Sequence, residues 1–155
     1  MNENWTRWIF ASMTKYISEH LTTASVIEGQ IKSALLDESD HIEIRLDGPI
    51  YSNPSKGSWE AYVEINLLIQ SVINETDLHN LERIIGECTI ALATIIPIYK
   101  YGNGVEDDGS LLGCMKLFSN RKGEDVIVSR FGQLRSSIKL IQAMVECHYT
   151  MSFND

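Results

Sequence analysis

The sequence predicts an α+β fold with a mainly antiparallel sheet, a long hairpin and two main helices packed on the sheet, in a single domain over residues 1–155. Two stretches repeat apolar side chains at steps of three and four, which is typical of amphipathic helices. Three others alternate apolar and polar side chains, which is typical of half-buried strands. Because helices and strands are grouped along the chain instead of alternating, an antiparallel sheet with the helices on one face is favoured.

The first element is expected to be a helix over residues 5–21, with Asn4 as a suitable N-cap. Its apolar stripe contains two tryptophans and a tyrosine, which bury a large area per residue. Core packing is the simpler interpretation of this stripe, and contact with a neighbouring subunit is the alternative. The stripe of this helix consists of Trp5, Trp8, Ile9, Met13, Tyr16, Ile17 and Leu21. After the helix, Val26 and Ile27 form a candidate short strand.

Residues 41–47 and 59–70 are predicted to pair as a long antiparallel hairpin. Gly48 and Pro49 are expected to end the first strand, because proline cannot donate to a strand ladder. Residues 51–58 are rich in Pro, Ser and Gly and are predicted to form the connecting loop. The apolar face of the second strand consists of Trp59, Ala61, Val63, Ile65, Leu67 and Ile69.

A second helix is predicted from an N-cap at Thr76, with Asp77 in its first turn, to about Ala93. Pro97 either ends this helix or begins an extended segment. Residues 101–110 contain several Gly and Asn residues and are predicted to form a loop.

The last third of the chain reads as strands. Residues 112–118 and 125–131 are the first two, and Gly132 is expected to break the pattern of the second. From Ile141 onward apolar and polar residues alternate strictly. A helix over residues 136–144 competes with the start of this last strand, but the period-two count favours the strand.

Composition excludes several classes of function. The chain carries 13 basic and 21 acidic side chains, a formal net charge of −8, which argues against binding nucleic acid by charge attraction. Apolar runs fall far short of the roughly 20 residues that cross a membrane, so no membrane association is expected. Cys88, Cys114 and Cys147 lie far apart and are interpreted as reduced thiols.

No catalytic residue, metal site or cofactor is predicted. The four histidines have no partner at metal-ligand spacing, and no HExxH or Cys–His motif is present. Glu60 and Glu64 share a strand face and could act as paired carboxylates, but no nucleophile accompanies them. The acids Glu106, Asp107 and Asp108 could hold a cation, yet a solvated loop tip is favoured. A non-enzymatic protein is therefore expected.

Residues 43–49, a loop and residues 59–68 together resemble the central part of small tailed-phage neck and tail-completion proteins, with the tail terminators as the most similar group. In that family a helix precedes a long hairpin, a second helix packs on the sheet, and further strands close the domain. The resemblance extends to the order of elements over most of the chain. It implies that residues 142–153 form the closing strand.

The resemblance implies a structural virion protein of the neck or tail, assembled in the host cytoplasm. Its copies would form a homo-oligomeric ring, typically of six, that caps the tail tube and joins it to the head connector. Tail tube, sheath and head connector proteins would be its partners, and double-stranded DNA would pass without specific binding. The alternatives are a head-closure or baseplate adaptor of the same phage class, or a non-viral small ligand-binding α+β domain.

Six residues are candidate subunit or lumen contacts on this interpretation. A closed ring needs two different patches that fit each other, and free strand edges can pair across subunits. Acidic groups that face a lumen would repel DNA phosphates, or would instead meet a partner ring. The six candidates are Glu106, Asp107, Asp108, Arg45, Asp47 and Tyr51.

Overall fold

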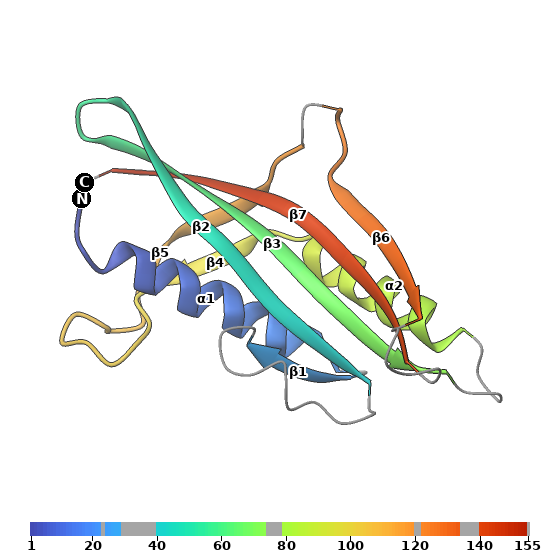
Figure 1. Cartoon of the computed structure of the whole chain (residues 1–155). Helices are drawn as coiled ribbons and strands as arrows, with labels where there is room; N and C mark the ends of the chain where they lie inside the picture. The colour runs from blue at the N-terminus through green and yellow to red at the C-terminus, as the bar shows by residue number, and fades with distance from the viewer. Residues whose placement is uncertain (23, 29–39, 74–78, 120–121, 134–139, 155) are drawn as a thin grey trace.

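The computed structural model describes residues 1–22, 24–28, 40–73, 79–119, 122–133 and 140–154. Over these residues two helices lie against a seven-stranded sheet of order β1-β2-β3-β7-β5-β4, with β6 also pairing with β7 (Figure 1). The pairs are antiparallel apart from β1 and β2, which are parallel. The predicted α+β class with a mainly antiparallel sheet is confirmed. The elements are α1 (Trp5–His20), β1 (Ser25–Glu28), β2 (His41–Ser55), β3 (Ser58–Val72), α2 (Asn80–Leu92), β4 (Ile96–Tyr99), β5 (Leu111–Leu117), β6 (Val126–Gln133) and β7 (Leu140–Asn154).

Helix α1 follows the predicted stripe, and its apolar side chains are buried in the core. Asn4 occupies the predicted N-cap position of this helix. Asn4 has helical backbone angles of φ −82° and ψ −12°, and its side chain makes no capping hydrogen bond. Its amide nitrogen instead donates to Glu106 Oε2 at 3.3 Å, a partner distant in sequence. The short strand expected at Val26 and Ile27 is confirmed as β1.

Strands β2 and β3 pair antiparallel along their length and meet at a turn at Lys56 and Gly57. The expectation that Gly48 and Pro49 end the first strand is wrong, because β2 continues to Ser55. Its register with β3 shifts at these two residues, and Gly48 adopts φ +103°. A bulge leaves a backbone position without a ladder bond, so a proline fits there. Much of the predicted loop is therefore strand.

The register shift also changes which residues of β2 face the helices. Before it, Ile42 and Ile44 are buried on the helix side of the sheet. After it, Tyr51 pairs with Ala61, which faces the core. The extra residue moves the inward positions from even to odd numbers.

Helix α2 ends at Leu92, with Ala93 as its C-cap, close to the predicted end. The predicted cap residues Thr76 and Asp77 lie outside the described residues. Pro97 lies inside β4, so the extended alternative is confirmed. No helix in the described ranges is both long and apolar enough to cross a bilayer.

The C-terminal strands follow the predicted order. Strand β6 passes through Gly132, where its register with β7 shifts, so the predicted break is a bulge and not an end. The alternative helix over residues 136–144 is wrong for residues 140–144, because these belong to β7. Residues 136–139 lie outside the described part of the chain.

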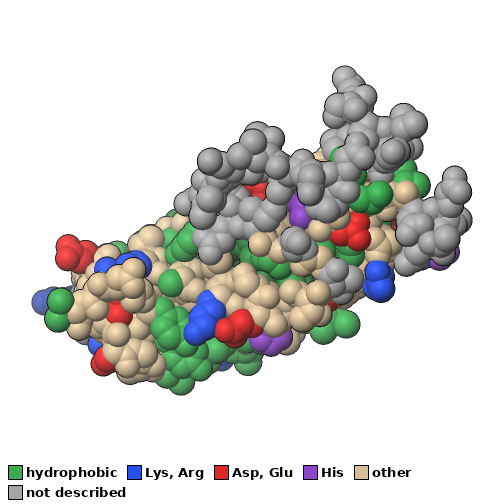
Figure 2. Space-filling model, turned by 90° about the horizontal axis from the view of Figure 1, so that it is seen from below, with side chains coloured by type: hydrophobic (Ala, Val, Ile, Leu, Met, Phe, Trp, Pro, Cys, Tyr) green, Lys and Arg blue, Asp and Glu red, His purple; other side chains and the backbone are tan. Residues whose placement is uncertain are grey.

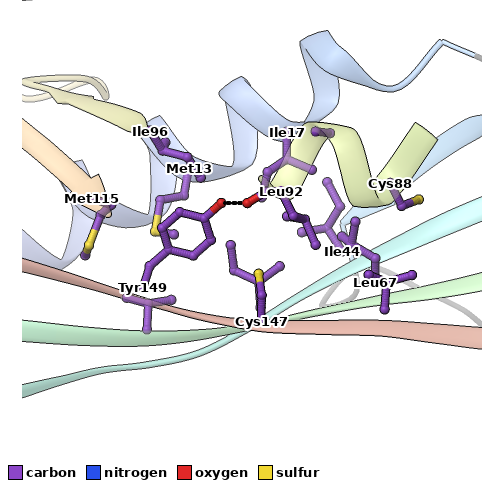
Figure 3. Close-up of a cluster of buried hydrophobic side chains, with 14 of the residues drawn as sticks. Met13, Ile17, Ile44, Leu67, Cys88, Leu92, Ile96, Met115, Cys147 and Tyr149 are labelled. Atoms are coloured by element: carbon purple, nitrogen blue, oxygen red, sulfur yellow. Dashed lines mark hydrogen bonds between the residues drawn. The ribbon is translucent and has the colours of Figure 1, made fainter. Parts of the chain in front are cut away.

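The core fills the space between both helices and the sheet (Figure 3). The Tyr149 hydroxyl reaches from β7 to the C-terminal end of α2, where it donates to the Leu92 carbonyl and lies 3.2 Å from the Thr94 carbonyl. These contacts of Tyr149 fix the position of α2 on the sheet.

The cysteines in the core are buried as well. Burial raises the pKa of the Cys88 and Cys147 thiols to about 12, so both are unreactive and neutral.

Candidate functional site

The six candidate contact residues fall into two regions of the molecule. Three lie in the loop between β4 and β5, beside the first turns of α1, and three lie on β2. The first three are Glu106, Asp107 and Asp108, here called the acidic loop, and the others are Arg45, Asp47 and Tyr51.

Asp107 is an internal anchor of the acidic loop. Its Oδ1 accepts from Arg7 Nη2 at 2.9 Å and from the Trp8 indole at 2.6 Å, and its Oδ2 accepts from the Gly104 amide at 2.6 Å. Only 3% of the side chain is exposed. The interpretation of this residue as part of a solvated loop tip is therefore wrong. The reason is that α1, distant in sequence, supplies two of the three donors.

These contacts also change the ionisation of Asp107. Desolvation alone would raise its pKa, but hydrogen bonds from Trp8, Gly104 and Arg7 outweigh it and lower the pKa. The pKa of an aspartate is about 3.9 in the unfolded chain, and a lower pKa in the folded state means that the ionised carboxylate stabilises the fold. This contribution is fully present at pH values above the unfolded-state pKa. That contribution disappears as the pH falls through the lower folded value.

Glu106 and Asp108 remain exposed on either side of this anchor. Glu106 Oε2 accepts from the side-chain amides of Asn2 at 3.0 Å and Asn4 at 3.3 Å. Asp108 Oδ1 accepts from the Ser110 hydroxyl and backbone amide, which lower its pKa. Contact of these two acids with a lumen or a partner ring stays a prediction.

Asp107→Asn is expected to lower the melting temperature by several degrees, because an amide presents a donor where three donors already converge. Glu106→Gln and Asp108→Asn are the matched controls, and both should melt close to the wild type. Thermal unfolding at pH 7 and at pH 3 checks this, and the difference between Asp107→Asn and wild type should shrink at the lower pH. Equal melting temperatures for all four proteins at pH 7 would contradict the anchor role.

The three candidates on β2 occupy both faces of the sheet. Arg45 Nε donates to Glu43 Oε1 at 3.1 Å, and Asp47 Oδ2 accepts from Asn66 Nδ2 at 3.2 Å. Both lie on the face away from the helices, here called the open face. Tyr51 lies on the other face, and its half-buried hydroxyl is 2.8 Å from Thr6 Oγ1 on α1. Burial raises the pKa of Tyr51, so its phenol stays neutral.

Among the described strands, β1 covers only the first part of the outer edge of β2, and the rest of that edge is here called the free edge. The four residues of β1 pair with His41 to Ile44 only. From Arg45 to Ser55 the described residues provide a strand partner on the β3 side alone. The exposed Ile50 lies along this edge and borders a surface cavity of about 270 Å³ together with Tyr62 and Phe118.

A cluster on the open face was missed by the sequence analysis. Glu64 of β3 pairs directly with His148 of β7, and Glu146 precedes His148 by two residues on the same face. The closest ligand atoms of the three side chains all lie within 4.8 Å of one another. Local spacing could not find this group, because the chain separates Glu64 from the other two by most of the C-terminal half. The alternating polar positions of the last strand were the only signal.

Glu60 and Glu64 do not form the paired carboxylates considered from the sequence. Four strand residues span roughly 13 Å, which is too far for a shared proton. Glu60 Oε2 accepts from the Tyr62 hydroxyl at 2.6 Å, while Glu64 faces Glu146 on the neighbouring strand.

The surroundings of Glu146 change its ionisation. Desolvation by burial and the nearby Glu64 carboxylate raise the pKa of Glu146. His148 offsets part of this rise, with its Nε2 at 3.3 Å from Glu146 Oε1.

Charges of both signs are mixed on the face seen in Figure 2, where basic, acidic and histidine side chains lie among hydrophobic ones. This described surface lacks the concentrated basic area that DNA binding by charge requires. No protein-family model matches the sequence, and no curated protein is significantly similar to it.

Proposed function

We propose that this protein is a structural, non-enzymatic subunit of a phage tail terminator or neck ring. Its copies assemble side by side, cap the tail tube and meet the head connector, and DNA passes through the ring. The observation that carries the proposal is the edge of β2 between Arg45 and Ser55, along which none of the described strands pairs. An order of elements like that of the tail terminators supports it.

A free strand edge presents unpaired N–H and C=O groups that can pair with a strand of another subunit. A ring requires such a contact to be heterologous, with this edge on one copy meeting a different patch on the next. Pro49 lacks a donor and lies in the bulge, so the edge cannot serve as a uniform template for open-ended sheet growth. Ile50, with 69% of its surface exposed, supplies an apolar anchor at that position.

The end of the β2–β3 hairpin forms an arm. Residues 52–57 are all exposed, and Figure 1 shows the turn extending beyond α1 at one end of the molecule. An arm of this kind can reach an adjacent component of an assembly while the core stays unchanged. The proposal therefore assigns the arm and the β2 edge to contacts with neighbouring proteins.

The packing of the core favours this assignment over a small ligand-binding domain. Such a domain would enclose a pocket between the apolar faces of helices and sheet. Here those faces pack against each other, and Ile84, Leu92 and Tyr149 are fully buried between them. The alternative is a head-closure or baseplate adaptor protein of the same phage class. The location of the protein in the phage particle distinguishes the two functions.

Location in the particle is the direct test. An antibody against the purified chain, visualised with gold on particles from the source lysate, should label the head–tail junction. Label at the distal tail tip would move the protein to the baseplate. Absence of label from every particle would overturn the virion role.

Ile50→Asp is expected to reduce incorporation into particles by about tenfold or more, because it places a charge on the proposed contact edge. Ile90→Asp is the matched control, since Ile90 is 73% exposed and lies on α2 instead of the β2 edge. Quantitative immunoblotting of purified particles measures incorporation. Equal incorporation of the two folded variants would remove the β2 edge from the assembly contacts.

A further inference from the structure

The open face carries a group of side chains that the ring proposal does not use. Glu64, Glu146 and His148 converge there from the two central strands β3 and β7. We propose that these three side chains bind one divalent first-row transition-metal ion, with Zn²⁺ as the ion they suit best. This site does not depend on the proposed ring function.

The geometry brings the ligands close to binding distance. Their ligand atoms lie within 4.8 Å of one another, and His148 Nε2 is 3.3 Å from Glu146 Oε1. Ligands at about 2.1 Å from a tetrahedral Zn²⁺ lie about 3.4 Å apart. Small rotations of half-buried side chains on rigid paired strands close the remaining difference. A fourth position stays open toward solvent for water.

The ligand set selects the kind of metal. Imidazole suits Zn²⁺, Co²⁺ and Ni²⁺, whereas sites for Mg²⁺ and Ca²⁺ are built from oxygen ligands alone. One imidazole with two carboxylates therefore favours a transition metal. The partly apolar surroundings, with the exposed ring of Phe118 edge-on to His148, limit access of water on one side.

The charge of the cluster favours a cation. Within the described part of the chain, neither Glu64 nor Glu146 is paired with a Lys or Arg. The neighbouring side chain that can carry a positive charge, when protonated, is His148. The Glu64 and Glu146 carboxylates lie close together, so their negative charges repel each other. A bound cation would relieve that repulsion without a shared proton.

A neighbouring amide orients one of the ligands. Asn66 Nδ2 donates to Glu64 Oε1 at 3.4 Å and to Asp47 Oδ2 at 3.2 Å. Outer contacts of this kind fix the orientation of metal ligands. A bound ion would join β3 to β7 across the open face and would stabilise the sheet.

Isothermal titration of the chelator-treated full chain with Zn²⁺ at pH 7.5 tests the site. The wild type should bind one equivalent, and millimolar Mg²⁺ should not compete. Glu146→Gln and His148→Gln should each weaken binding by about tenfold or more. Glu60→Gln and His20→Gln are the matched controls for the loss of a carboxylate and an imidazole elsewhere, and they should bind as the wild type does.

Thermal unfolding separates a loss of binding from a loss of fold. Without metal, Glu146→Gln should melt at or above the wild-type temperature, because the substitution removes the carboxylate repulsion. Added Zn²⁺ should raise the melting temperature of the wild type and of Glu60→Gln but not of Glu146→Gln. Wild-type protein that binds no Zn²⁺, or folded Glu146→Gln and His148→Gln variants that bind it unchanged, would overturn the proposal.

Discussion

Gly48→Ala is expected to lower the free energy of unfolding by roughly 2–4 kcal/mol, through backbone strain and steric overlap. Gly48 adopts φ +103°, where residues with a Cβ are strained. A Cβ built there would lie 2.8 Å from the Tyr62 carbonyl oxygen and 3.0 Å from the Ile50 amide nitrogen. Both neighbours are backbone atoms of the hairpin, so neither can rotate away.

Urea unfolding followed by tryptophan fluorescence measures this loss. Gly57→Ala, at φ +80° with no atom within 4 Å of the added Cβ, isolates the backbone strain and should cost less. Gly86→Ala lies in α2 in open space and should stabilise the protein by about 0.5–1 kcal/mol. A Gly48→Ala protein as stable as Gly57→Ala would show that the hairpin absorbs the added atom.

The same substitution has a local consequence. The bulge at Gly48 places Tyr51 on the helix side of the sheet, where its hydroxyl is 2.8 Å from Thr6 Oγ1 and its ring meets Phe153 edge-on. Loss of the bulge would turn Tyr51 outward and separate the hairpin arm from α1. The contact edge of the proposed ring subunit therefore depends on one glycine.

Tyr149→Ala is expected to cost about 3–5 kcal/mol, because it opens a cavity in the centre of the core. Tyr149 is fully buried, and its hydroxyl lies within hydrogen-bond distance of the Leu92 and Thr94 carbonyls at the end of α2. Tyr149→Phe keeps the ring and should cost about 1–3 kcal/mol, since the two carbonyls then lose their donor. Burial also raises the pKa of this phenol, so the donor persists at neutral pH.

Tyr62→Phe is the matched control for the loss of a hydroxyl. Tyr62 lies half-buried on the open face, where its hydroxyl donates to Glu60. Its removal should leave stability almost unchanged, because Glu60 can be hydrated instead. Hydrogen exchange of the last turn of α2 should accelerate in Tyr149→Phe alone. Similar unfolding curves for the two variants would contradict the proposed anchoring of α2.

Two features of the candidate site could not be predicted from local sequence patterns. The alternation along β7 placed Glu146 and His148 on one polar face, and this is correct. Nothing local indicated that Glu64 lies opposite His148, because strand register depends on the whole sheet. Likewise, three consecutive acids suggested a solvated loop, yet the middle one is held by Arg7 and Trp8 from α1. Partners distant in sequence decided both outcomes.

Periodicity alone determined the α+β class and the inward faces of α1, β3 and β7, because burial of apolar side chains follows the repeat of each element. The tertiary structure decided that β2 continues through Pro49, that Tyr51 turns inward, and that three ligating side chains meet on the open face. Each of these features depends on backbone register between strands. Register is fixed only when the strands pair and the two helices cover one face, so no local stretch of sequence contains it.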